Sequence, residues 1–210
     1  MKKKILLLAI LFSNVAFGQT RNDVFDSKVP VTWLGLDFTA AMFIGDREKL
    51  GTGEGIRSML YAWNNLVINE PAKYDIAKAI DRLSVEKDIT ATEERIAALK
   101  VDGMYSDKTA DHFHINPQDV EEIVKSYNFG ELKGIGLLFI VESFNKLNVE
   151  GSIYAAFINI ETKEVLFTER MTGAPGGFGL RNYWAGAIYT ILKNMTKKEF
   201  SMWRKKHQRS

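Results

Sequence analysis

GLLFIV (residues 136–141), SIYAAFINI (152–160) and VLFT (165–168) are the three stretches of sequence that decide the fold of this chain. Each is rich in aliphatic, β-branched and aromatic residues, and only the polar turn ETKE at 161–164 separates the second from the third. This pattern predicts three consecutive strands that pair as an antiparallel meander. Because the first two stretches are apolar on both faces, we expect both faces of the sheet to be covered.

The preceding part of the chain predicts one more strand and a series of helices. Residues 31–38 (VTWLGLDF) follow Pro30 and have the composition of a strand. Apolar residues recur at helical spacing over about 54–68, 71–83, 90–100 and 117–129, and again from Arg181 onward. The expected fold class is therefore α+β, with a mixed, largely antiparallel sheet made of the C-terminal three-strand meander plus the N-terminal strand and covered by helices.

The first 18 residues, MKKKILLLAILFSNVAFG, have the organisation of a secretory signal peptide. Three lysines precede a short apolar run, and Ala16 and Gly18 supply the small residues that favour cleavage before Gln19. The run is shorter than the roughly 20 apolar residues of a membrane-spanning helix, and no later stretch reaches that length. The chain has no cysteine, which excludes disulfides, a thiol nucleophile and a lipid-bearing cysteine. We expect an exported protein, periplasmic or extracellular, without a transmembrane segment after signal removal.

Charge is unevenly distributed once the expected signal peptide is removed. The full chain has 28 basic and 26 acidic residues, and loss of the three leading lysines leaves 25 minus 26, or −1. Residues 193–210 hold seven basic residues and one acid, so residues 19–192 carry 18 minus 25, or −7. An acidic body with a basic tail does not favour a nucleic-acid partner. The tail residues expected to contact either the body or an anionic surface such as lipid headgroups are Lys197, Lys198, Arg204, Lys205, Lys206 and Arg209.

The length and composition predict one domain. Removing 18 of 210 residues leaves 192, and a chain with 46% hydrophobic residues can build a substantial core. No linker, repeat or low-complexity segment divides it. The expected organisation is a signal peptide at 1–18, a loose lead-in at 19–29, a single α+β domain at 30–195 and a basic C-terminal helix or tail at 196–210.

The last third of the chain has the order strand, polar gap, strand, turn, strand, glycine loop and helix. The turn is the Asn-x-Glu-Thr-Lys segment at 159–163, and the helix contains Asn-Tyr-Trp at 182–184. This order resembles the small α/β domain of bacterial envelope proteins such as the TolB N-terminal domain and CsgG-like outer-membrane assembly proteins. It covers roughly residues 132–195 and, more loosely, the strand at 34–38 with the helix after it. The chain also resembles uncharacterised exported proteins of diderm bacteria. The resemblance implies an envelope interaction module without catalysis.

Asp111-His112-Phe113-His114 is the only cluster of histidines in the sequence. In an extended segment, residues two apart project to the same side, so His112 and His114 are candidate ligands of one metal ion, with Asp107 or Asp111 completing the site. The alternative is that both are solvated histidines on a loop that leads into the capped helix at 117–129. The sequence supplies no further cofactor motif.

The glycine-rich stretch GAPGGFG at 173–179 is longer than a strand-to-helix connection requires. The amides at the start of the following helix attract anions, and aromatic and cationic side chains stand next to them. We therefore expect a binding surface formed by Gly176, Gly177, Phe178, Arg181 and Tyr183. The alternative is that the glycines allow close backbone packing and that Phe178 is buried.

Signatures of catalysis are weak. The stretch GTGEGIRS at 51–58 lacks the Gly-Lys-Ser/Thr of a phosphate-binding loop, and no Gly-x-Ser-x-Gly nucleophile elbow occurs. The expected function is a non-catalytic binding or assembly component of the bacterial cell envelope, which contacts a protein partner or a second copy of itself. The alternative is a small periplasmic metal-dependent hydrolase that uses the His112 and His114 region.

Overall fold

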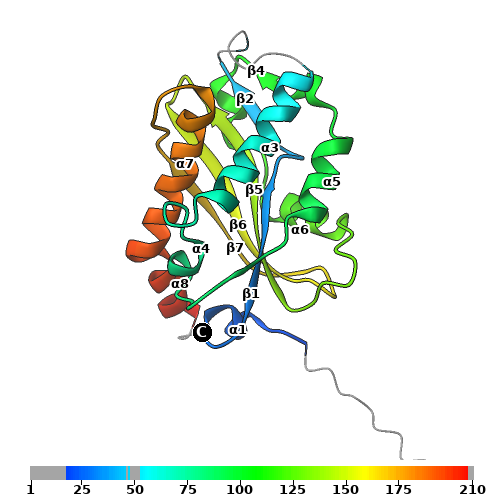
Figure 1. Cartoon of the computed structure of the whole chain (residues 1–210), viewed down its shortest axis with the longest axis vertical. Helices are drawn as coiled ribbons and strands as arrows, with labels where there is room; N and C mark the ends of the chain where they lie inside the picture. Colours follow the sequence, from blue (N-terminus) through cyan, green and yellow to red (C-terminus); the bar gives the residue numbers. More distant parts are fainter. Residues whose placement is uncertain (1–17, 46, 48–52, 208–210) are drawn as a thin grey trace, which may run out of the picture.

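The computed structural model describes residues 18–45, 47 and 53–207. The expected signal peptide lies outside these residues except for Gly18. One sheet runs through the described part of the chain, flanked by helices (Figure 1). Its strands are β1 (Val31–Asp37), β2 (Met42–Ile44), β3 (Glu86–Lys87), β4 (Tyr105–Ser106), β5 (Ile135–Asn145), β6 (Glu150–Asn159) and β7 (Glu164–Gly173).

Strand β5 is the centre of the sheet. Along one edge it pairs in parallel with β1 over its first half and with β2 near its end, so these two short strands lie one after the other. Strand β3 pairs in parallel with β1, and β4 pairs in parallel with β2. On the other edge, β6 is antiparallel to β5, and β7 is antiparallel to β6. Among the described strands, β6 is therefore antiparallel to all the others.

The expectation of a largely antiparallel sheet is wrong. Four of the six strand pairings in the described residues are parallel, and the fold is a mixed α/β fold. The meander of β5, β6 and β7 is present, but it is only one side of the sheet. The difference arises because a parallel pair needs a crossover connection rather than a tight turn, so Val31 pairs with the distant Ile135 without a local sequence signal.

The helices lie on both faces of the sheet. They are α1 (Arg21–Phe25), α3 (Glu54–Asn69), α4 (Ile76–Ala79), α5 (Thr90–Ala98), α6 (Pro117–Lys125), α7 (Leu180–Asn194) and α8 (Phe200–His207). Short 3-10 turns at Val101–Gly103 (η1) and Thr109–His112 (η2) accompany them, and a π-helix at Met195–Glu199 (η3) joins α7 to α8. One core cluster packs α1, α3, α7 and α8 on the face that carries Trp33 and Phe139. A smaller cluster packs α6 on the face that carries Leu138 and Ile140.

Helix boundaries follow the capping residues. Asn116 accepts hydrogen bonds from the backbone N–H groups of Gln118 and Asp119, which confirms the expected cap of α6. The helix expected over 71–83 is shorter, because Asp75 caps a four-residue helix through the Lys78 N–H. The residues before it form turns instead.

Two boundary predictions need correction. The lead-in at 19–29 is not loose, because residues 21–25 form α1 and bury Val24 and Phe25 in the main core. The tail is not separate from the domain at 196, since η3 and α8 continue α7 and bury Phe200 and Trp203. These aromatic side chains hold the terminal helix on the body.

Candidate functional site

The loops that follow β2, β5 and β7 lie at one end of the molecule, which we call the carboxyl edge. Gly45 follows β2, the turn 146–149 follows β5, and the glycine loop 174–179 follows β7. Figure 1 shows β2 and β4 at this end and α1 and α8 at the opposite end. Open α/β sheets bind ligands beyond the carboxyl ends of the strands, where the strand order changes direction. Here that change falls between β2 and β5.

The glycine loop 174–179 is fixed to the start of α7 by its backbone. The N–H of Gly176 donates to the carbonyl of Tyr183, and the N–H of Tyr183 donates to the carbonyl of Gly179, both at 2.9 Å. A Cβ atom on Gly186 would lie 2.2 Å from the carbonyl oxygen of Gly176, so only glycine fits there. The loop is therefore held in place without using its side chains.

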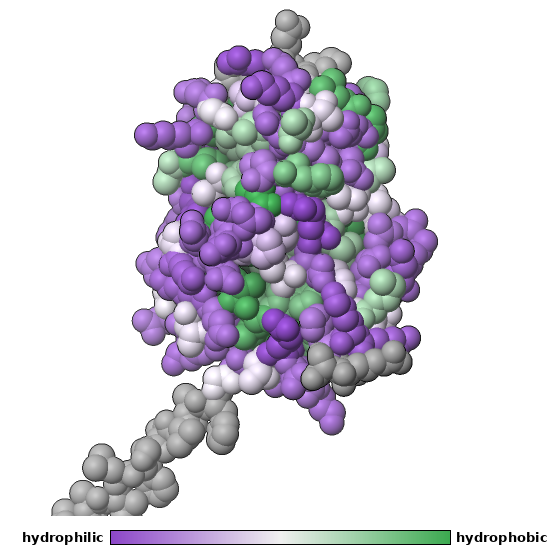
Figure 2. Space-filling model, turned by 180° about the vertical axis from the view of Figure 1, so that it is seen from behind, coloured by the Kyte–Doolittle hydropathy of each residue, from purple (hydrophilic) through white to green (hydrophobic). Residues whose placement is uncertain are grey.

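Apolar side chains at the carboxyl edge face water. Phe178 in the glycine loop is 96% exposed, and the turn after β5 adds Leu147 at 57% and Val149 at 50%. The turn after β5 meets the first turn of α7, where the Lys146 ammonium lies 3.9 Å from the centroid of the Tyr183 ring, a cation–π contact. Figure 2, seen from behind, shows hydrophobic atoms at the upper right, toward this end. We call the following residues the carboxyl-edge surface: Lys146, Leu147, Val149, Phe178, Arg181 and Tyr183.

The five residues expected to form a binding surface lie in the glycine loop and the first turn of α7, where the Gly176 N–H donates to the Tyr183 carbonyl. Gly176, Gly177, Phe178 and Arg181 are exposed, and Tyr183 is half-buried. Phe178 is not a buried plug. The Arg181 carbonyl accepts a hydrogen bond from Trp63 Nε1 at 2.9 Å, which ties the start of α7 to α3. Leu147 and Val149 could not be predicted from the sequence, because a short turn does not reveal which loop lies beside it.

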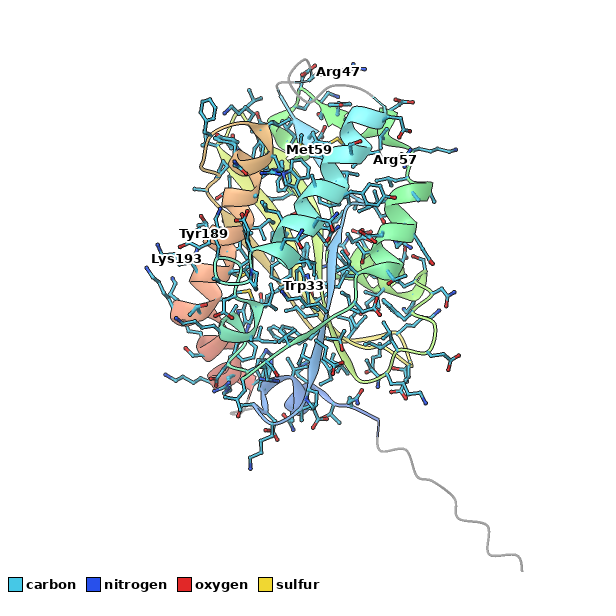
Figure 3. The ribbon with its side chains drawn as sticks, in the orientation of Figure 1. Trp33, Arg47, Arg57, Met59, Tyr189 and Lys193 are labelled. Atoms are coloured by element: carbon cyan, nitrogen blue, oxygen red, sulfur yellow. The ribbon has the colours of Figure 1, made fainter. Side chains whose placement is uncertain are left out.

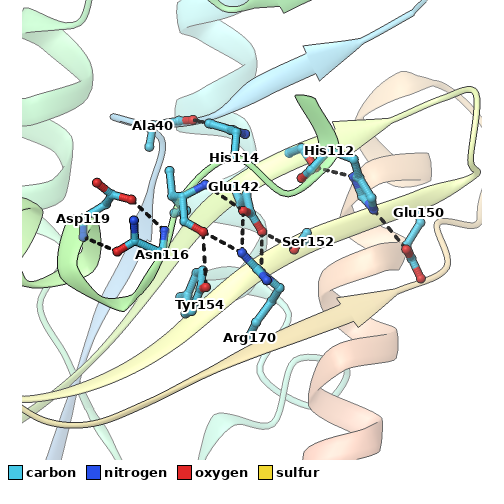
Figure 4. Close-up of polar contacts among 12 residues, drawn as sticks. Ala40, His112, His114, Asn116, Asp119, Glu142, Glu150, Ser152, Tyr154 and Arg170 are labelled. Carbon is cyan, nitrogen blue, oxygen red and sulfur yellow. Dashed lines mark hydrogen bonds and ion pairs between the residues drawn. The ribbon is translucent and has the colours of Figure 1, made fainter. Parts of the chain in front are cut away.

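A buried ionic cluster lies where β5, β6 and β7 pass beneath the segment before α6 (Figure 4). Glu142 is fully buried and accepts hydrogen bonds from Arg170 Nε at 2.9 Å and Nη2 at 3.0 Å. It also accepts from the Ser152 hydroxyl at 2.7 Å and from the Ile115 N–H at 3.0 Å. These four hydrogen bonds compensate the burial of the carboxylate.

The same cluster holds the segment before α6 on the sheet. The carbonyl of Ile115 accepts from the Tyr154 hydroxyl at 3.3 Å and from Arg170. Burial raises the pKa of Tyr154 above its ordinary value. Glu142, Tyr154 and Arg170 thus bind the backbone of Ile115, and the cluster fixes this segment to the sheet.

His112 connects two other groups of the sheet. Its Nδ1 lies 2.6 Å from Ser143 Oγ, and its Nε2 lies 3.0 Å from a carboxylate oxygen of Glu150. The order serine, histidine, carboxylate is that of a hydrolytic triad, but the ring nitrogens are exchanged, since in that triad Nε2 faces the serine and Nδ1 faces the carboxylate. Ser143 is fully buried, however, and its hydroxyl also lies 2.9 Å from the His112 carbonyl, to which it can donate. A substrate would reach this oxygen only if the chain above it moved.

His114 does not share these partners. Its Nδ1 lies 2.8 Å from the Asp111 carbonyl oxygen, and its Nε2 lies 2.9 Å from the Ala40 carbonyl oxygen. All four ring nitrogens of His112 and His114 therefore face atoms of the protein. Within the ranges that the structure describes, no three His, Cys, Asp or Glu side chains are grouped as a metal site requires. Metal binding by this pair stays a prediction, and it would require these contacts to break.

A second buried carboxylate, Asp37, lies at the end of β1. It accepts from the Tyr127 hydroxyl, from Arg95 Nε at 3.0 Å and from the Thr39 N–H at 2.7 Å. Burial raises the pKa of Tyr127 well above its ordinary value, and the neighbouring Asp37 carboxylate raises it further. Neither this carboxylate nor Glu142 is among the site residues predicted from the sequence. The available signal was a charged residue within or directly after an apolar strand, which has to find partners in the interior.

The basic tail lies partly on the acidic body. Arg204 binds Asp81 at 2.7 Å, and Lys206 lies 3.7 Å from Glu169. Lys198 pairs with its neighbour in sequence, Glu199. The ammonium groups of Lys197 and Lys205 form no ion pair with any described residue, and Arg209 lies outside the described residues.

Comparison with known protein families, with curated proteins and with solved structures gives no match. The resemblance to small envelope domains therefore stays a prediction. In the part of the chain that the structure covers, no helix combines the length and the apolar character needed to cross a bilayer.

Proposed function

We propose that this protein is an exported, non-catalytic binding or assembly component of the bacterial cell envelope, and that it contacts a protein partner through the carboxyl-edge surface. The observation that carries the proposal is the exposure of Phe178, at 96%, on a loop whose backbone is fixed. A large aromatic side chain presented to water in this way is typical of an interface residue.

The chemistry of the surface indicates what kind of partner it fits. Phe178, Leu147 and Val149 offer apolar contact, and the exposed Arg181, three residues after Phe178, offers a guanidinium. Aromatic residues and arginine are enriched at protein interfaces. A partner with an apolar pocket and an acidic rim matches this combination.

The sequence supports the compartment in the proposal. Residues 1–18 have the pattern of a secretory signal, with three lysines before a short apolar run. The acidic balance of residues 19–192 supports a protein partner over a nucleic acid.

Site-specific photocrosslinking in the bacterium that makes the protein tests the proposal. A benzophenone side chain replaces Phe178 in one variant and Leu83, which is 105% exposed in a different loop, in the matched control. We expect a discrete adduct from position 178 and none from position 83. An adduct that contains a second copy of the chain would identify a homo-oligomer. Recovery of only the free monomer from position 178, or of the same adducts from both positions, contradicts the proposal.

A second candidate function, a small hydrolase, has one observation in its favour, the contact of His112 with both Ser143 and Glu150. A fluorophosphonate probe would label Ser143 if the segment above it opens, and Ser143→Ala would abolish that labelling. Elemental analysis of untagged protein for zinc, copper and iron tests the metal-dependent form of the same idea. Absence of both labelling and metal leaves the binding function.

A further inference from the structure

A basic hollow lies between α4 and the end of α7, away from the carboxyl edge. It has a volume of ≈ 340 Å³. Figure 3 labels Tyr189 and Lys193 on α7, and both line this hollow. The charged residues lining the hollow are Lys73, Lys78, Lys193, Lys197 and Asp75, and Tyr189 and Thr196 add hydroxyl groups.

The positive charge of the hollow is largely uncompensated. Asp75 uses one carboxylate oxygen to accept the backbone N–H of Lys78 at 2.9 Å, as the cap of α4. Lys73 lies 3.7 Å from Glu70. The other three ammonium groups, those of Lys78, Lys193 and Lys197, form no ion pair with any residue that the structure describes.

The backbone is irregular at this hollow. Residues Met195–Glu199 form a π-helix between α7 and α8, and π-turns inside helices occur frequently at functional sites. The π-helix carries Lys197 and Thr196, which line the hollow together with Lys193 from the last turn of α7. Lys193 and Lys197 are four residues apart, and their like charges repel each other. An anion bound between the two ammonium groups would offset this repulsion.

We infer that this hollow binds the phosphate groups of a ligand. Lysine ammonium groups bind phosphate as mobile point charges, and the hydroxyl group of Tyr189 can donate to its oxygens, whereas that of Thr196 donates to the Leu192 carbonyl at 2.9 Å. The volume of the hollow is within the usual range of small-molecule sites. Lys73 and Lys78 of the hollow belong to the acidic segment 19–192, and Lys193 and Lys197 belong to the basic segment 193–210, so the hollow lies where the two segments meet. A soluble phosphate compound and the headgroup of an anionic lipid share this chemistry.

The test uses the mature chain and two triple variants with the same loss of charge. The first, Lys78→Gln/Lys193→Gln/Lys197→Gln, removes the unpaired cations of the hollow. The control removes three other exposed lysines that form no ion pair with described residues, in Lys100→Gln/Lys108→Gln/Lys133→Gln. Exposed lysines contribute little to stability, and circular dichroism checks that both variants are folded.

Two probes distinguish the sources of phosphate. Isothermal titration calorimetry with inorganic pyrophosphate measures binding of a free phosphate compound. Co-sedimentation with phosphatidylglycerol vesicles, against phosphatidylcholine vesicles, measures binding of a lipid headgroup. Both are done in about 0.1 M salt, where charges more than about 10 Å apart are screened from each other.

We expect the wild-type and control proteins to bind at least one probe, and the hollow variant to bind it roughly 100-fold more weakly, since each lysine near an anionic surface contributes about a factor of five. Binding of pyrophosphate without vesicle binding identifies a soluble ligand, and vesicle binding identifies a headgroup. The inference is overturned if the wild type binds neither probe, or if the control variant loses as much affinity as the hollow variant. Neither result bears on crosslinking at Phe178, so the proposed function is tested separately.

Discussion

The two ends of the sheet use aromatic side chains in opposite ways. At the end opposite the carboxyl edge, Phe25, Phe167, Phe200 and Trp203 are almost fully buried against one another, with ring centroids 5.2 Å apart between Phe25 and Phe167 and between Phe167 and Trp203. At the carboxyl edge, Phe178 makes no such packing and faces water. Helices α1 and α8 cover the first end, and no described helix covers the second in this way (Figure 1).

This difference separates stability from binding along the length of the molecule. A buried aromatic side chain stabilises the fold by several kcal/mol, whereas an exposed one contributes little until a partner covers it. Substitutions at the covered end should therefore change the free energy of unfolding. Substitutions at the open end should change only binding.

The largest expected effect is at the covered end. Trp203→Ala removes a side chain that is 6% exposed and packs on Phe167 and Phe200. We expect a loss of about 3–5 kcal/mol in the free energy of unfolding, measured by chemical denaturation. Trp203→Phe, which keeps an aromatic ring, should lose clearly less. A loss below about 1 kcal/mol for the alanine variant would show that the packing of α8 at this end contributes little to the free energy of unfolding.

The next effect concerns the ionic cluster between the two ends. Arg170→Met removes the positive partner of the buried Glu142 and keeps an apolar side chain of similar length. We expect a loss of about 2–3 kcal/mol by thermal or chemical denaturation, because a buried carboxylate is left without its counter-charge and the guanidinium is itself partly exposed. Adding Glu142→Gln should recover part of this loss, and strict additivity of the two changes would contradict the pairing.

A smaller effect is expected where β1 ends. Tyr127→Phe removes the hydroxyl that donates to the buried Asp37, and we expect a loss of about 1–2 kcal/mol near neutral pH. Because the pKa of Tyr127 is higher in the folded state than in the unfolded chain, its contribution is fully present below the ordinary pKa of about 10. That contribution is lost as the pH rises through the folded-state pKa. The variant should therefore show a shallower alkaline loss of stability than the wild type, and parallel pH profiles would refute the assignment.

The smallest effect on stability is expected at the open end. Phe178→Ser should change the free energy of unfolding by no more than about 0.5 kcal/mol, because the side chain is already exposed. Leu83→Ser is the matched control for an exposed apolar residue in another loop. Pull-down of envelope proteins with immobilised protein should lose specific partners with the first variant and keep them with the second. A large loss of stability in Phe178→Ser would mean that the glycine loop depends on this side chain.

Much of the fold could be predicted from the sequence where the signal is local. Strands β5, β6 and β7 follow one another with a short turn between the last two, so their pairing follows from neighbouring residues. The cap of α6 is visible in Asn116 and Pro117 for the same reason. Strands β2, β3 and β4 have only two or three residues each, too few to show a period of alternation. Their parallel pairing, and hence the class of the sheet, depends on contacts between distant segments.

The candidate site divides in the same way. Glycines around Phe178 mark a loop that departs from ordinary backbone geometry, and the sequence shows this directly. The contact between Lys146 and the Tyr183 ring depends on the relative placement of β5 and α7. No local sequence pattern predicts that placement. The sequence shows that Glu142 is unusual, because it is a charged residue directly after the apolar stretch GLLFIV. It does not show that Arg170 is the partner of Glu142.

The backbone contact between Gly176 and Gly186 has a consequence for the rates of binding. Because the loop that presents Phe178 is already ordered by this contact and by its hydrogen bonds, a partner does not have to order it on association. The loss of conformational entropy on binding is then limited to a few side chains, at about 0.5–1.5 kcal/mol for each long one. Differences in affinity among variants of the carboxyl-edge surface should accordingly appear in the dissociation rate, with the association rate nearly constant.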